Sequence, residues 1–266
     1  ILPTPCRKEL ISAMNHGMTI ISGLHHYLSE DQEFQKIAKK NSVDLVDIRK
    51  SRPVSDLHFW TGEILNVDTP IIAVLGTDCA VGKRTTARFI LEACKTLGIK
   101  TELIFTGQTG WMQGYKHGFI FDATPNDFVS GELERVIMEC VKNSKPELIL
   151  VEGQSSLQNP SGPGGSEFIL SGNATGVILV HPLGRKFFVD LEEFEYPIPE
   201  LEDEVKLIES YGTKVIGIGL NEENASLEEL REFQKITENN LNIPVILPLT
   251  DGVANFANYI KENILV

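Results

Sequence analysis

A short apolar run that leads into a glycine-containing loop and then into a helical segment constrains this chain more than any other stretch. Residues 71–75 read Ile-Ile-Ala-Val-Leu, which is typical of a strand covered on both faces of a parallel sheet. Gly76 and Gly82 allow the backbone to turn its N–H groups inward around an anion. Lys83 follows, at the start of a helix expected over residues 84–97, and the helix dipole favours the same anion. The segment therefore predicts a phosphate-binding loop.

The loop departs from the standard Walker pattern, in which a glycine opens the loop and a hydroxyl residue after the lysine binds magnesium. Thr77 stands in place of that glycine and Arg84 in place of the hydroxyl residue, so Thr85 or Thr86 would have to supply the metal ligand. The alternative is a strand, turn and helix without a ligand, but the glycines, the lysine and both flanking elements together favour a nucleotide or a phosphorylated cofactor. We expect the whole loop to contact it: Gly76, Thr77, Asp78, Cys79, Ala80, Val81, Gly82, Lys83, Arg84, Thr85 and Thr86.

Strand and helix patterns alternate after residue 70. Strands are expected over residues 71–75, 101–106, 147–151, 175–180, 214–220 and 244–247, and helices near 84–97, 131–143, 199–211, 227–239 and 253–263. Ser226 with Glu229 predicts a helix start, and Gly98 and Gly212 predict helix ends. This pattern predicts an α/β fold of the P-loop NTPase type, a mostly parallel sheet with helices on both faces and ligands at the carboxyl ends of the strands.

Residues 1–50 form a smaller alternating unit, interpreted as part of a Rossmann-like domain. Helices are expected over residues 6–15 and 31–40 and strands over 18–22 and 43–48, with Ser29 and Gln32 as a capping box. Because the chain begins without methionine, we expect upstream sequence to be missing. The connector 49–70 lacks a sustained period, which predicts domains over 1–68 and 69–266. Its aromatic residues, His58, Phe59 and Trp60, are expected to pack the connector against a domain.

Composition excludes several classes of protein. The formal net charge is -13, with 24 Lys and Arg against 37 Asp and Glu, which argues against a nucleic-acid partner because phosphate backbones need a basic surface. No apolar stretch is long enough to span a membrane, and residues 1–8 lack the layout of a signal peptide. Cys6, Cys79, Cys94 and Cys140 form no CxxC pair, so we expect a reduced, cytoplasmic setting. Cys79 is interpreted as space-filling rather than nucleophilic.

Polar residues near the ends of the expected strands are the candidates for chemistry. Glu152 follows an apolar strand and could hold magnesium, although a glutamate ending a strand at solvent is the alternative. Asp122 could add a second carboxylate ligand, and Asp127 could serve as a base toward an amine or as the cap of the helix expected from Gly131. The segment 106–111 would present small polar groups beside the phosphates. The loop 153–166 could close over a substrate or form a disordered excursion.

Two residues after the strand expected over 175–180 complete the candidates. Arg185 could bind a carboxylate bidentately or pair with Glu192. His181 could act as a general base, although a lone histidine at a strand end is more often structural. Together with Lys83 and Asp127, they form the predicted catalytic set.

Motifs spread over nearly the whole chain resemble the D-glutamate N-acetyltransferase-like family. They are Gly23-Leu24-His25, Asp47-Ile48-Arg49, the loop 76–86, Thr106-Gly107-Gln108-Thr109-Gly110, Asp122-Ala123, Asn126-Asp127-Phe128 and Glu152-Gly153-Gln154. The resemblance implies a Rossmann-like N-terminal domain and a P-loop C-terminal domain. It further implies, for at least some members, acyl transfer from acetyl-CoA to an acidic D-amino acid.

The loop by itself also resembles that of dethiobiotin synthetase and its relatives, P-loop enzymes that use ATP and magnesium to activate a carboxylate or carbamate. The similarity lies in Gly76-Thr77-Asp78 and Val81-Gly82-Lys83. It implies a metal-binding aspartate at Asp122, a strand-end glutamate at Glu152 and an adenine-contacting residue at Asn221.

Three functions stay open at this point. An N-acetyltransferase would hold acetyl-CoA by its phosphates without hydrolysis, and Arg84 fits a phosphate that is not transferred. An ATP- and magnesium-dependent ligase or kinase would gather Thr85, Asp122 and Glu152 around a metal. A nucleotide-sensing protein would bind without turnover and would lack organised carboxylates. For the enzymes, the expected partner is a small carboxylate or amino acid, and a homo-oligomer stays open.

Overall fold

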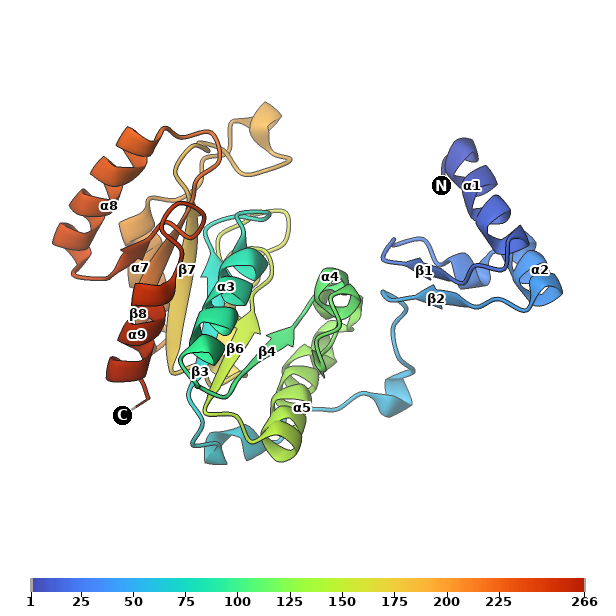
Figure 1. Ribbon diagram of the computed structural model, residues 1–266, viewed down its shortest axis with the longest axis horizontal. Coiled ribbons are helices and arrows are strands. Elements are labelled where there is room, and N and C mark those ends of the chain that lie inside the picture. The colour runs from blue at the N-terminus through green and yellow to red at the C-terminus, as the bar shows by residue number, and fades with distance from the viewer. Residues whose placement is uncertain (1, 266) are drawn as a thin grey trace.

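Two parallel sheets, of two and seven strands, organise the chain in the computed structural model, which describes residues 2–265. The small sheet and its helices lie apart from the large sheet, and a linker that contains short 3-10 turns joins the two units (Figure 1). None of the helices within residues 2–265 combines the length and hydrophobicity needed to span a bilayer.

The N-terminal unit consists of α1 (Thr4–Asn15), β1 (Ile20–Ser22), α2 (Gln32–Asn41) and β2 (Leu45–Asp47). Its strands pair in parallel, and Met14 and Phe34 are fully buried in its small apolar core. The predicted capping box is wrong: Asp31 caps α2 by accepting from the N–H groups of Glu33 and Phe34. Ser29 cannot cap this helix because it lies in a 3-10 turn that precedes it.

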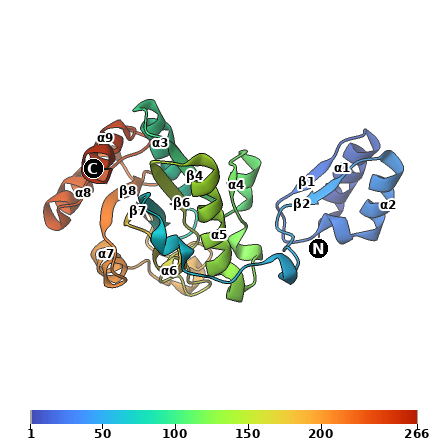
Figure 2. The ribbon, with the colours of Figure 1, turned by 90° about the horizontal axis from the view of Figure 1, so that it is seen from below.

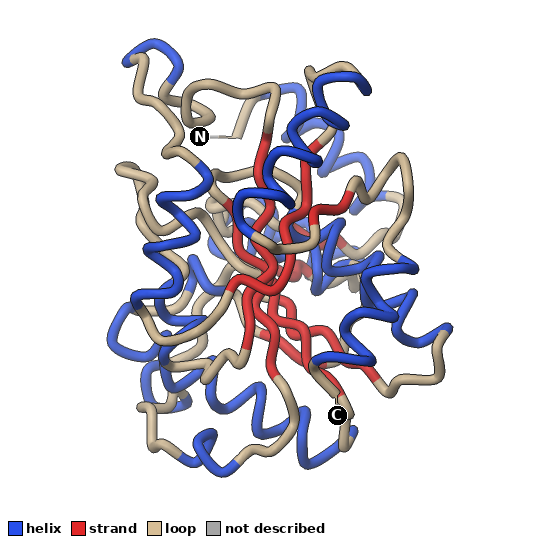
Figure 3. The backbone as a smooth tube through the Cα atoms, turned by 90° about the vertical axis from the view of Figure 1, so that its left-hand side faces the viewer, coloured by secondary structure: helices blue, strands red, loops and turns tan. Residues whose placement is uncertain are grey.

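The large sheet contains every strand expected after residue 70 and one short addition, β5. Its strands are β3 (Ile71–Gly76), β4 (Thr101–Phe105), β5 (His117–Gly118), β6 (Leu148–Glu152), β7 (Gly176–Pro182), β8 (Val215–Asn221) and β9 (Val245–Ile246). All pairs are parallel, in the order β5-β4-β6-β3-β7-β8-β9. The predicted fold class is confirmed, and the sheet lies between layers of helices (Figure 3).

Helices cover both faces of this sheet, which is why its central strand is apolar throughout. One face packs against α3 (Lys83–Thr96) and α9 (Ala254–Asn263). The other packs against α5 (Asn126–Ser144), α6 (Ser166–Leu170), α7 (Leu201–Ser210) and α8 (Leu227–Leu241). Figure 2 shows α3 and α9 on one side and α6 and α7 on the other. Ile72 and Val74 enter the first core, whereas Ile71, Ala73 and Leu75 enter the second.

After residue 70 the helix ends follow the sequence signals, except at the start of α5. Ser226 and Glu229 form the predicted capping box, and Gly98 and Gly212 adopt positive φ just after their helices. Helix α5 begins at Asn126 and not at Gly131. Asp127 therefore lies in the first turn and does not cap the helix, so that alternative is wrong.

Gly131 serves close packing rather than a helix start. A Cβ at this position would lie 2.0 Å from the carbonyl oxygen of His58. The linker thus rests directly on the backbone of α5. Phe59 packs on Phe128 with ring centroids 4.7 Å apart and ring planes tilted by 35°, and Trp60 donates to the carbonyl of Ser171. The expected packing of the linker aromatics is confirmed.

Two buried glutamates of α5 hold the linker through its backbone. Glu134 accepts from the N–H groups of Thr61 at 2.5 Å and Ile64 at 3.1 Å. Glu132 accepts from the N–H of His58 at 3.1 Å and pairs with Arg52 at 2.7 Å. Burial acts to raise the pKa of Glu134, but the hydrogen bonds outweigh it and lower the pKa below its ordinary value. The two carboxylates therefore accept the hydrogen bonds that the N–H groups of the linker would otherwise donate to water.

Replacing Glu134 by alanine is expected to lower the free energy of unfolding by about 2 kcal/mol, because the linker N–H groups lose their buried acceptor. Glu139→Ala is the matched control on the same helix, since Glu139 is exposed and forms a surface ion pair with Arg135; it should cost less than about 1 kcal/mol. Urea unfolding measures both. Equal midpoints for the two variants would show that the linker is not held in this way.

Candidate functional site

A cavity of about 450 Å³ opens at the carboxyl ends of the strands of the large sheet. It is lined by the loop after β3, by α4 (Gln108–Met112) and the glycine before it, and by the residues that end and follow β6. The lining residues are Arg49, Cys79, Ala80, Val81, Gly82, Lys83, Arg84, Thr85, Gly107, Gln108, Thr109, Glu152, Gly153, Gln154 and Ser155. The rule that parallel strands present ligand sites at their carboxyl ends places the cavity at this edge.

Glycine is required at two positions of the loop, for a different structural reason at each. Gly82 has φ of 97°, a conformation that favours glycine, and it precedes the first residue of α3. A Cβ at Gly76 would lie 2.6 Å from Cγ2 of Val81, so the strand end needs a glycine for the loop to fold back over it. Ala80 also adopts positive φ, at 52°.

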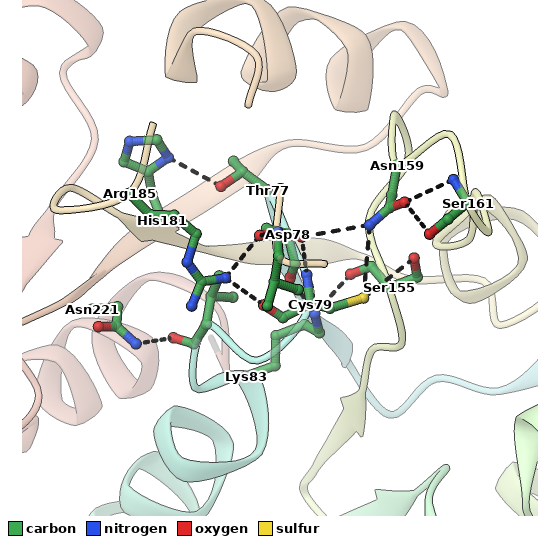
Figure 4. Close-up of polar contacts among 12 residues, drawn as sticks. Thr77, Asp78, Cys79, Lys83, Ser155, Asn159, Ser161, His181, Arg185 and Asn221 are labelled. Atoms are coloured by element: carbon green, nitrogen blue, oxygen red, sulfur yellow. Dashed lines mark hydrogen bonds and ion pairs between the residues drawn. The ribbon is translucent and has the colours of Figure 1, made fainter. Parts of the chain in front are cut away.

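Lys83 is buried at the base of this loop. Its Nζ donates to the carbonyl oxygens of Asp78 and Ser155, each at 2.7 Å (Figure 4). Burial lowers the pKa of Lys83 from 10.5 to about 8, while nearby Cys79 acts to raise it. Lys83 is therefore largely charged at neutral pH. It lines the cavity at the first residue of α3, where a cation can meet phosphate oxygens.

The carboxylate of Asp78 faces away from the cavity and holds the loop in place. It is fully buried and accepts from Nη1 of Arg185 at 2.7 Å and from the N–H of Val189 at 2.9 Å. Arg185 also donates to the carbonyl of Cys79 at 2.8 Å (Figure 4). The expected alternative of a pair with Glu192 is wrong, because Arg185 pairs with Asp78.

Two further candidates contact the loop from outside the cavity. His181 lies 3.0 Å through Nδ1 from Oγ1 of Thr77 and stacks on Phe233. Burial lowers the pKa of His181 to about 4, so the ring is neutral at pH 7. Asn221 donates to the carbonyl of Val81 at 3.0 Å (Figure 4). Both side chains support the shape of the loop.

The predicted magnesium ligands are only partly brought together. Thr85 and Glu152 line the cavity, whereas Asp122 forms an ion pair with Arg49 and is not part of the lining. Thr86 is buried beside Gly219 on the far side of the loop. Within residues 2–265, no group of three or more His, Cys, Asp or Glu side chains is arranged to hold a metal.

Glu152 is the acidic group of the cavity. Its side chain is 7% exposed, and burial raises its pKa above the ordinary value. Nη1 of Arg84 lies 4.0 Å from one carboxylate oxygen, and the N–H of Thr106 donates to the other at 3.4 Å. A buried carboxylate with a raised pKa beside a cation is suited to accept a proton.

Of the lining residues outside the phosphate loop, Gly107, Gln108 and Thr109 belong to the segment 106–111, which was expected beside that loop. Gly153, Gln154 and Ser155 begin the loop 153–166, which was expected to cover a substrate, whereas Arg49 was not among the predicted site residues. Gln154 donates to Oγ1 of Thr106 at 2.9 Å, and Ser155 lies next in the chain. Gln108 and Thr109 open the short helix α4. Arg49 follows β2 and was assigned to the connector. The place of Arg49 after a strand is a signal that could have identified it, but polar residues after strands are too common for that signal alone.

The loop 153–165 is folded and not a disordered excursion. Asn159 is buried and contacts the carboxylate of Asp78 at 3.4 Å, and its own side-chain oxygen accepts from Ser161. Gln158 donates to the buried carboxylate of Glu204 on α7 at 2.5 Å. The first residues of the loop 153–165 form one wall of the cavity, and these contacts hold the loop in a defined conformation.

The lowered pKa of Lys83 predicts a dependence of stability on pH. Between pH 8 and 10.5 the unfolded chain carries a proton on this amine that the folded protein has released. The free energy of unfolding should therefore rise with pH across this window, by about 3 kcal/mol in total. Urea unfolding at successive pH values, compared with Lys83→Met, isolates this contribution.

Lys95→Met is the control for that experiment, because Lys95 is a half-exposed lysine of the same helix. It should retain the rise that Lys83→Met removes. If the free energy of unfolding rises with pH equally in the wild type and in Lys83→Met, the pKa of Lys83 is not lowered in the folded protein.

Comparisons with known proteins agree with this division of the chain. The P-loop domain model of the DUF1611 family, a domain of unknown function, matches residues 58–257, and the family's N-terminal Rossmann-like domain model matches residues 1–51. The crystal structure of a DUF1611 family protein from Anabaena variabilis superposes with a TM-score of 0.88 at 26% identity, covering 98% of this chain and 76% of that one. The predicted boundary between residues 68 and 69 stays a prediction.

Two curated relatives carry a functional name. A D-glutamate N-acetyltransferase from Pseudoalteromonas sp is 29% identical over 246 residues, which cover 91% of this chain and 72% of the relative. A D-glutamate N-acetyltransferase from Tritonibacter scottomollicae is 26% identical over 257 residues, 95% of this chain and 75% of the relative. The family resemblance noted in the sequence is confirmed, and the chain belongs to the DUF1611 family, with a Rossmann-like N-terminal domain and a P-loop C-terminal domain.

Proposed function

We propose that this chain is an N-acetyltransferase that moves the acetyl group of acetyl-CoA to the amino group of D-glutamate or a similar acidic amino acid. Two relatives named for that activity support the proposal. A cavity that joins a phosphate-binding loop to a buried carboxylate supports it further. The formal charge of -13 fits a small-molecule partner better than a nucleic acid. A cytoplasmic location and the oligomeric state stay predictions.

The placement of Arg84 is the observation that carries this proposal. Arg84 replaces the hydroxyl residue that normally binds magnesium, lines the cavity and directs its guanidinium toward Glu152. A phosphate that is transferred needs a metal to neutralise charge that develops during the reaction. A phosphate that is only held needs a positive charge beside it, which Arg84 and the largely protonated Lys83 supply. CoA presents phosphates of the second kind.

The cavity also offers the groups that acetyl transfer requires. The ammonium of the amino acid must first lose a proton, and the amine then attacks the thioester carbonyl. A C–N bond forms, the C–S bond breaks, and the nitrogen gives up a second proton while the leaving thiolate takes one up. Glu152 is placed to accept the ammonium proton, because it is buried in the cavity and its pKa is raised by burial. Of the predicted catalytic residues, Lys83 lines the cavity, whereas Asp127, His181 and Arg185 do not.

An ATP- and magnesium-dependent ligase is the second candidate, and one observation favours it. Thr85 and Glu152 both line the cavity beside Lys83, and a hydroxyl with a carboxylate suits magnesium, which prefers oxygen ligands. They would hold the ion against a phosphate and supply a Lewis acid. A nucleotide sensor would use the same loop without turnover.

Acetyl-CoA is expected to stabilise the protein through Lys83. At about 100 times its dissociation constant it should add about 2.7 kcal/mol to the free energy of unfolding, which thermal unfolding detects as a rise of several degrees. Lys83→Ala should abolish the rise, and Lys95→Ala, on the exposed part of the same helix, should keep it. With D-glutamate added, the wild type should release free CoA thiol.

Arg84→Thr separates the two enzyme hypotheses, because it restores the standard Walker residue. An acetyltransferase should lose stabilisation by acetyl-CoA in this variant and gain none from ATP with magnesium. If only ATP with magnesium stabilises the wild type in a Lys83-dependent manner, the acetyltransferase proposal is wrong and the ligase replaces it.

A further inference from the structure

Arg49 is the contribution of the N-terminal unit to the cavity. It lies just after β2, and among the described lining residues it alone comes from the region matched by the Rossmann-like model. Its Nε donates to the carbonyl of Gly23, which follows β1, at 2.7 Å. The carboxyl ends of both strands of the small sheet thus face the carboxyl ends of the large one.

The guanidinium of Arg49 is held by two partners, which leave some of its N–H donors available. Nη1 forms an ion pair with Asp122, and the side chain is 12% exposed. Arginine has five N–H donors, and Gly23 and Asp122 are the partners that the described residues offer it. Burial lowers the pKa of Arg49, because removal from water disfavours its charged form. A planar cation oriented in this way matches the geometry of a carboxylate.

The order of the groups along the cavity can be derived from the contacts. Glu152 lies between Arg84, at 4.0 Å, and α4, where a Cβ on Gly110 would be 3.3 Å from its carboxylate. The N-terminal unit contacts α4 as well, since a Cβ on Gly23 would be 2.8 Å from the side chain of Gln108. The phosphate loop, Glu152, α4 and the Gly23–Arg49 edge therefore follow one another.

The charges along this sequence of groups differ in what they can bind. Lys83 and Arg84 belong to the phosphate loop and suit the phosphates of the acyl donor. Glu152, in the middle, suits an ammonium or the amine that it becomes. Arg49 is a further cation of the lining, contributed by the other unit, and Glu152 is the carboxylate that shares the cavity with it. An amino acid with its amine at Glu152 would direct a carboxylate toward Arg49.

We propose that Arg49 binds a carboxylate of the amino-acid acceptor, so that the N-terminal unit selects the acceptor while the P-loop domain holds the acyl donor. This assignment rests on the proposed function. Arg49 is here a specificity-determining residue, and Asp122 positions its guanidinium. The competing explanation is that Arg49 and Asp122 only join the two units.

Equilibrium binding of D-glutamate, measured by calorimetry with saturating CoA, tests the assignment without requiring turnover. Arg49→Gln should weaken binding of D-glutamate about 10- to 100-fold, the loss expected for a charge-assisted hydrogen bond. Arg49→Lys should recover part of it. Arg52→Gln is the matched control, because Arg52 pairs with Glu132 and does not line the cavity; its affinity for D-glutamate should equal that of the wild type.

Steady-state kinetics separate selection of the acceptor from joining of the units. Arg49→Gln should raise KM for D-glutamate by a similar factor and leave KM for acetyl-CoA unchanged. Asp122→Asn, which keeps the arginine, should have a smaller effect on KM for D-glutamate. If Arg49→Gln and Asp122→Asn instead raise both KM values alike and lower the melting temperature equally, the role is structural and the assignment is wrong.

Failure of the assignment and failure of the proposed function give different results. Binding of D-glutamate that depends on Arg49, without thiol release from acetyl-CoA, would leave the acceptor site standing and overturn the acetyltransferase. Acetylation that persists in Arg49→Gln with an unchanged KM for D-glutamate would support the acetyltransferase and overturn the assignment of Arg49. Absence of D-glutamate binding in the wild type would overturn the assignment.

Discussion

The site depends on a buried carboxylate that lies behind it. Asp78 is removed from solvent and held by Arg185, by the N–H of Val189 and by Asn159. Removing one partner of such a buried pair typically costs 3–5 kcal/mol, because the other charge is left without compensation. The loop is therefore held in shape from its outer side, with its N–H groups and Lys83 left to meet an anion. Because the loop is already ordered, ligand binding does not have to offset the entropy of ordering it.

The same arrangement explains why the most conspicuous polar residues do not all touch the cavity. Arg185, His181 and Asn221 lie at or just after the ends of the neighbouring strands β7 and β8. They contact Asp78, Thr77 and the carbonyl of Val81, respectively. Their side chains therefore fix the backbone of the loop from its outer side. Residues that follow β4 and β6 reach the inner side instead, where Glu152 and Arg84 face each other.

The linker makes the two units into one site. Glu132 and Glu134 of α5 satisfy the linker backbone, and Gly131 allows it to lie against the helix. This brings the end of β2, and with it Arg49, to the cavity. A shared site of this kind suits a reaction with two substrates, since each unit can recognise one of them.

The sequence by itself determined the large sheet, the phosphate loop and most helix ends. The apolar strand, the glycines at 76 and 82 and the pair Ser226 and Glu229 act within a few residues, so their meaning is local and readable. Only the tertiary structure decided which polar residues meet. Asp122 was expected at a metal and pairs with Arg49, 73 positions earlier in the chain, and Gly131 was expected to start a helix and packs on the linker. Such contacts depend on how distant segments cross in space, and no local pattern records that crossing.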